Sequence, residues 1–133
     1  MGVLGIGGLF FRARDPDMLT AWYRDNLNVG AGCTSTNDGA ADEWSWMVEG
    51  GPVVFSPFKE DTDYFPRDKS YMLNLRVRNL TQFIAELKNR GIEVITNEEW
   101  NDPNVGRFAR LNDPEGNPIE LWEPPIEDSP EQG

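Results

Sequence analysis

Carboxylates and arginines are the residues of this chain that could do chemistry, because the 133 residues include no histidine and one cysteine, Cys33. Imidazole is the usual nitrogen ligand of zinc, nickel and iron, so the two-histidine, one-carboxylate set that binds iron cannot form. Glu120 stands out because it lies in the apolar closing segment 117–123. A carboxylate in such a place can act as a general base or anchor a ligand.

Two arginines occupy equivalent positions in an internal repeat. The segment LFFRARDP at 9–16 is echoed by LNLRVRNL at 73–80, which pairs Arg12 with Arg76. Guanidinium groups can hold a carboxylate or a phosphate of a ligand by forked hydrogen bonds. The alternative is that each arginine forms an ion pair with one of the many nearby acids. A repeat of almost half the chain predicts two similar modules within one domain.

The first half reads as a strand, a helix and three strands. Alternation predicts a strand at 6–14, and Asp15 followed by Pro16 predicts the start of a helix at 16–27. Strands are expected at 30–36, 43–49 and 52–58, followed by an acidic linker at 59–69.

The second half repeats this order. A strand is expected at 70–77, then a helix at about 79–90 that Asn79 caps and an apolar stripe defines. Further strands are expected at 92–96, 106–112 and 117–123, the last two joined by a hairpin turn at 113–117. We therefore predict a single α+β domain over 1–133, with βαβββ modules at 6–58 and 70–123. Each module is expected to form half of a curved, pseudo-symmetric sheet or half-barrel with its helix outside, and 124–133 to be a tail.

Three segments carry a resemblance to a known family. The ending GRFARLNDPEGNPIELWEP resembles the closing hairpin of the vicinal oxygen chelate superfamily, which contains the glyoxalase I, bleomycin-resistance and extradiol dioxygenase proteins. RARDPDMLTAWYRDNL and LRVRNLTQFIAELKNRGIEV resemble its two strand-helix units, so the resemblance spans about residues 6–124. It implies the fold predicted above and a small-molecule cavity between the modules, but one fold hosts many reactions.

The resemblance also implies where a metal would bind. In the metal-using members the ligands come from the first and fourth strand of each half, and the matching positions here are Gly8, Ser56, Met72 and Glu120. Only Glu120 is a good ligand, so we predict no metal or other cofactor. The alternative is a carboxylate-and-water site for magnesium or manganese, built from Glu120 with Glu43 or Glu49.

Strand alternation from these positions predicts which side chains face the cavity. The ligand-binding candidates are Phe10, Arg12, Trp46, Ser56, Phe58, Met72, Asn74, Arg76, Glu120 and Trp122. Glu120 is also the candidate catalytic residue, although it could instead pair with an arginine for stability. Trp46 shares a face with Trp44, and the two could be core residues. Tyr64 and Phe65 are candidates for a lid or a dimer contact.

The amino-acid composition limits the kinds of partner that the protein could bind. The net charge of −11 with no lysine and arginine cluster makes nucleic acid and anionic membranes poor partners. No segment is long and apolar enough to span a membrane, and no secretory signal is evident. The single Cys33 cannot form an internal disulfide, which suits a reducing cytoplasm, and its other interpretation is an ordinary small residue in a strand. Five tryptophans and seven phenylalanines in so short a chain favour a homodimer.

Three hypotheses for function follow. We favour a cytoplasmic glyoxalase- or bleomycin-resistance-like domain that binds a small organic molecule without the usual metal. The alternative is a metal-dependent lyase, isomerase or dioxygenase of the same superfamily that uses Glu120. The third is a structural or regulatory interaction domain whose cavity has no ligand.

Overall fold

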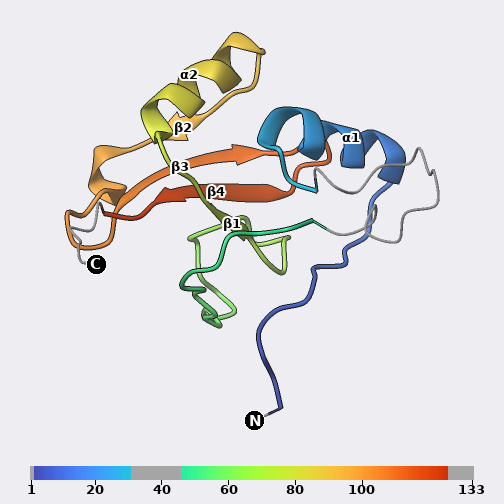
Figure 1. Ribbon diagram of the computed structural model, residues 1–133, viewed down its shortest axis with the longest axis horizontal. Helices are drawn as coiled ribbons and strands as arrows, with labels where there is room; N and C mark the ends of the chain where they lie inside the picture. Colours follow the sequence, from blue (N-terminus) through green and yellow to red (C-terminus); the bar gives the residue numbers. More distant parts are fainter. Residues whose placement is uncertain (1, 31–45, 126–133) are drawn as a thin grey trace. The chain divides into compact units, whose positions relative to one another are not determined.

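The computed structural model describes residues 2–30 and 46–125 and divides the chain into two units, Met1–Met47 and Val48–Gly133. The described elements are helices α1 and α2, a short 3-10 helix and a four-stranded mixed sheet (Figure 1), so the fold is α+β as predicted. No helix in these two ranges has the length and apolar character needed to cross a membrane.

The first unit contains α1, Pro16–Leu27, with the bounds predicted from the sequence. The Asp15 side chain accepts a hydrogen bond from the backbone N–H of Met18 at 3.2 Å, which satisfies one of the free donors at the helix start. The helix ends where Asn28 adopts a left-handed conformation with φ 59°. One face is buried and carries Leu19, Tyr23 and Leu27.

The predictions of strands at 6–14 and 52–58 are wrong, because the structure has no strand there. The same holds for residues 46–49 of the strand predicted at 43–49. A strand exists only through hydrogen bonds to a neighbouring strand, and these segments have none within the described residues. Their apolar side chains are exposed, with Phe10 at 94% and Phe55 at 84%. The alternating pattern identified segments that could form strands, but it could not show whether a neighbouring strand is there to pair with them. The strand predicted at 30–36 lies outside the described residues except at its first position, as do Cys33, Glu43 and Trp44.

The second unit has the βαβββ order that the sequence predicted for 70–123. Its strands are β1 Leu73–Arg76, β2 Ile95–Thr96, β3 Arg107–Asn112 and β4 Pro118–Glu123, and α2 is Leu80–Asn89. The sheet order is β1-β4-β3-β2. β1 runs parallel to β4, whereas β3 is antiparallel to both β4 and β2.

The turn at 113–117 fixes the register of β3 against β4. Asp113 is buried, and its Oδ1 accepts the backbone N–H groups of Glu115 at 2.8 Å and Asn117 at 3.0 Å. Gly116 supplies the left-handed position of this turn with φ 86°. The hairpin therefore pairs Asn112 with Pro118, which brings Arg110 opposite Glu120.

The start of α2 departs from the sequence-based prediction. Asn79 has φ 57°, and its side chain makes no capping hydrogen bond. The Glu123 carboxylate at the end of β4 caps the helix instead, because Oε2 accepts the N–H of Asn79 at 3.0 Å and Oε1 that of Leu80 at 3.4 Å. The start of α2 is therefore capped by a side chain of β4 and not by the side chain of the residue that precedes the helix.

The two faces of this sheet differ in chemistry. α2 contacts β4 and lies to one side of the sheet (Figure 1), where alternate strand residues are apolar and the core forms. Its buried members are Leu80, Leu87, Val94, Ala109, Leu111, Ile119 and Leu121. The intervening residues of β1, β3 and β4 point to the opposite face and, apart from Pro118, are polar or aromatic.

Candidate functional site

Glu120 lies at the centre of this polar and aromatic face. It is only 4% exposed, and the register places it between Asn74 of β1 and Arg110 of β3. A buried carboxylate is costly unless donors surround it, so its neighbours decide whether the position is tolerable.

Three donors meet the Glu120 carboxylate from three parts of the unit. Oε1 accepts a hydrogen bond from the Asn74 amide at 2.8 Å, and Oε2 accepts one from the Tyr64 hydroxyl at 2.8 Å. Arg110 Nε lies 3.5 Å from the same Oε2 and completes a mostly buried ion pair. The arginine-paired role that the sequence allowed for Glu120 is therefore realised, and Arg110 is the partner.

Arg110 is held between two aromatic rings. Its guanidinium carbon lies 4.2 Å from the centre of the Tyr64 ring and 4.9 Å from that of Trp100, both within cation–π range. Its Nη1 donates to the Tyr64 backbone carbonyl at 2.5 Å. The buried Nε has no hydrogen-bond acceptor among the described residues, since 3.5 Å to Glu120 is an ion-pair distance.

Tyr64 closes over Glu120 from the segment that the sequence identified as a linker. Its ring packs against Phe58 at 5.3 Å between centroids, and Phe58 also meets Phe65 at 5.8 Å. Burial raises the pKa of the Tyr64 hydroxyl above its usual value, and the hydrogen bond to Glu120 raises this pKa further. The hydroxyl therefore remains a donor to the carboxylate at neutral pH.

A second row of side chains continues the face beside Glu120. The rings of Trp122 and Phe108 are parallel within 4° at 6.4 Å, and the Trp122 indole N–H donates to the carbonyl of Val105 at 2.8 Å. Arg76 Nη2 donates to the carbonyl of Glu49 at 2.8 Å. Its partner is thus a backbone carbonyl, whereas the carboxylate of Glu49 pairs with Arg78 at 2.9 Å on the surface.

The remaining predicted ligand-binding residues fall in both units. Phe10, Arg12 and Trp46 belong to the first unit and are exposed, and Ser56, Phe58 and Met72 belong to the second. The structure thus brings together Asn74, Arg76, Glu120 and Trp122 on one sheet face. Phe58 joins them through Tyr64.

Sequence reasoning missed three residues of the site: Phe108 and Arg110 on the sheet face, and Trp100, which contacts Arg110. Alternation was applied to the closing strand but not to its hairpin partner, although the turn at 113–117 is enough to set the register. Phe108 and Arg110 could therefore have been found. Trp100 ends the 3-10 helix Glu98–Trp100, and no periodicity in the sequence indicates this element.

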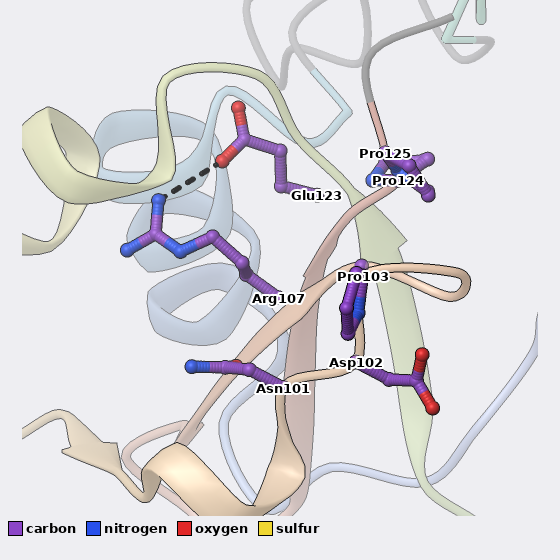
Figure 2. A pocket seen from close by; sticks show the side chains of 8 residues that line it. Asn101, Asp102, Pro103, Arg107, Glu123, Pro124 and Pro125 are labelled. Carbon is purple, nitrogen blue, oxygen red and sulfur yellow. Dashed lines mark hydrogen bonds and ion pairs between the residues drawn. The ribbon is translucent and has the colours of Figure 1, made fainter.

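A hollow lies at the end of the hairpin away from its turn. It has a volume of about 370 Å³ and is lined by Asn101, Asp102, Pro103, Gly106, Arg107, Glu123, Pro124 and Pro125 (Figure 2). Arg107 spans it to reach the Glu123 carboxylate at 3.3 Å, and its other nitrogen donates to the hydroxyl of Thr81 at 2.9 Å. Arg107 and Glu123 pair with each other, and the Asp102 carboxylate accepts the backbone N–H of Asn104 at 2.7 Å. Three of the remaining lining residues are prolines.

The residues around Glu120 do not suit the metal that the resemblance implies. Both carboxylate oxygens face hydrogen-bond donors, and the positively charged guanidinium of Arg110 already lies against one of them, where it would repel a metal cation. Ser56, Met72 and Gly8 add no strong ligand. Within residues 2–30 and 46–125, no group of three or more aspartate, glutamate or cysteine side chains could hold a metal ion.

The chain is similar in structure to TnmS3, an antibiotic-binding protein from Streptomyces sp. CB03234, with a TM-score of 0.57 and 22% sequence identity over 93% of this chain and 98% of that chain. It also resembles a glyoxalase family protein from Bacillus anthracis, with a TM-score of 0.37 and 32% identity over 47% of this chain and 49% of that chain. No protein-family model and no curated protein matches the chain. The first similarity shows the fold.

Proposed function

We propose that this protein binds a small organic molecule, without a metal, on the polar and aromatic face formed by β1, β3 and β4. The observation that carries the proposal is a buried carboxylate, Glu120, surrounded by aromatic rings and oriented donors. Small-molecule sites combine mostly apolar walls with a few fixed polar groups, and this face has that anatomy. An antibiotic-binding protein of the same fold supports the class of ligand.

The proposal is tested on the purified full-length protein. Native mass spectrometry should detect a co-purified organic molecule, and a panel of aromatic antibiotics should include compounds that raise the melting temperature. A ligand at a hundred times its Kd stabilises by about 2.7 kcal/mol, which a melting curve resolves easily. Trp122→Ala should weaken that shift, whereas Trp22→Ala on α1 is the matched control. Absence of any adduct and of any stabilising compound would contradict the proposal.

We propose further that the protein is a cytoplasmic homodimer. Large apolar side chains are exposed on segments 3–10 and 53–55, namely Val3, Leu4, Ile6, Phe10, Val53, Val54 and Phe55. A second copy of the chain is the simplest cover for such surface. Light scattering at high micromolar concentration should give twice the chain mass, and a monomer mass would reject the dimer.

A further inference from the structure

The site contains a phenol of its own. Tyr64 presents its ring to the Arg110 guanidinium at 4.2 Å and its hydroxyl to the Glu120 carboxylate at 2.8 Å. The ring of Phe58 packs beside the Tyr64 ring, with 5.3 Å between their centroids. These contacts together are the recognition elements for a hydroxylated aromatic ring: a cation under the ring, a carboxylate for the O–H and an aromatic wall beside it.

Tyr64 is bound less firmly than a core residue. Tyr64 is 37% exposed and lies in the segment 59–69, which contains no helix or strand. By contrast Leu87 and Leu121, on the α2 side of the sheet, are fully buried. The ring can therefore leave without opening the core.

Arg110 is poised to respond if Tyr64 leaves. Its buried Nε has no hydrogen-bond acceptor in the described chain and lies 3.5 Å from the Glu120 oxygen that Tyr64 occupies. Removal of the tyrosine hydroxyl would let this N–H close on the carboxylate, which offsets part of what is lost. The pair then offers a formed anchor to an incoming hydroxyl.

We propose that the Glu120–Arg110 site recognises a phenolic ring of its ligand, which binds by displacing Tyr64. This inference rests on the proposed function and names the chemical class of the ligand. The displacement costs the contacts that Tyr64 makes, so the protein's own phenol lowers the apparent affinity of the ligand.

The test uses calorimetry at neutral pH with 2-naphthol as the probe and 2-methoxynaphthalene, which has the same ring system and no O–H, as its control. Wild type should bind 2-naphthol in preference to 2-methoxynaphthalene. Tyr64→Ala should bind 2-naphthol about tenfold more tightly than wild type, because one hydrogen bond no longer has to be displaced. Tyr71→Ala, which removes a half-buried tyrosine elsewhere in this unit, should leave the affinity at the wild-type value.

Adding Glu120→Gln to Tyr64→Ala should reduce the preference for 2-naphthol by about tenfold, because the hydroxyl then meets a neutral amide. If Tyr64→Ala does not fold, the comparison of the two naphthalenes on wild type still shows whether the site recognises the phenolic hydroxyl. Equal binding of both compounds, or binding of neither, would overturn the inference. A co-purified molecule without a phenol would overturn it while leaving the proposed function intact, and absence of any ligand would overturn both.

Discussion

Replacement of Glu123 by alanine tests the assignment of the cap on α2. The carboxylate accepts one strong hydrogen bond from Asn79 N at 3.0 Å and one weak bond from Leu80 N at 3.4 Å. Loss of a helix cap costs roughly 0.5–2 kcal/mol, and a hydrogen bond to a charged group contributes about 1.5–3 kcal/mol. The ion pair with Arg107 adds little, because the Arg107 side chain is 48% exposed.

We therefore expect Glu123→Ala to lower the free energy of unfolding by about 2 kcal/mol. For a chain of this size that corresponds to a fall in Tm of roughly 6–10 °C. Urea unfolding followed by circular dichroism measures the change, and an unchanged m-value shows that the denatured state is the same.

The matched control is Asn79→Gly. Because Asn79 has φ 57° and its side chain makes no capping bond, glycine adopts the same backbone without strain and should change stability by less than about 0.5 kcal/mol. A neutral Glu123→Ala, or an Asn79→Gly that costs as much as Glu123→Ala, would refute the assignment of the cap to Glu123. The first result would mean that Glu123 does not cap the helix, and the second that Asn79 contributes to the cap as the sequence suggested.

Three further outcomes follow from the second unit. Gly106→Ala should destabilise by about 2–4 kcal/mol in urea unfolding, because φ is 132° and a Cβ would collide with the Glu123 carbonyl, whereas Gly50→Ala has open space and should be neutral within about 0.5 kcal/mol. Leu87→Ala should cost about 2–5 kcal/mol because the side chain is fully buried, and a loss below about 1 kcal/mol in the same assay would contradict that packing. Since the pKa of Tyr64 is raised by burial from 10.0, the unfolded chain releases its proton first, so stability should fall as pH rises above about 10. Tyr64→Phe should reduce this slope, and Tyr71, whose pKa is raised as well, should account for the part that remains.

Much of the second unit could be predicted because its signals are local. The turn Asp113–Asn117 closes on itself through the Asp113 side chain, and that turn alone fixes the β3 and β4 register. The alternation of 117–123 then places Glu120 and Trp122 on one face and the core residues Ile119 and Leu121 on the other. A sequence contains all of this information within a dozen residues.

The rest depends on partners that no local pattern names. Residues 6–14 have the composition and alternation of a strand, but pairing requires a second segment at the right distance, and none of the described residues provides it. The cap of α2 comes from Glu123, which lies 44 residues after Asn79 and 43 after Leu80, the two residues whose amides it accepts. Trp100 reaches Arg110 only because a short 3-10 helix ends there.

Burial of Glu120 links the stability of the second unit to its chemistry. A carboxylate that is 4% exposed is tolerated only if donors replace the water it has lost. Those donors come from β1, from β3 and from the linker, so the same three contacts that make the site also fasten Tyr64 and Arg110 to the sheet. Removal of one of these donors leaves the Glu120 carboxylate with too few hydrogen bonds. The hydroxyl of a phenolic ligand can replace the hydrogen bond that Tyr64 makes. A ligand that supplies such a hydroxyl can therefore exchange with Tyr64 at small net cost, while an apolar molecule of the same shape cannot.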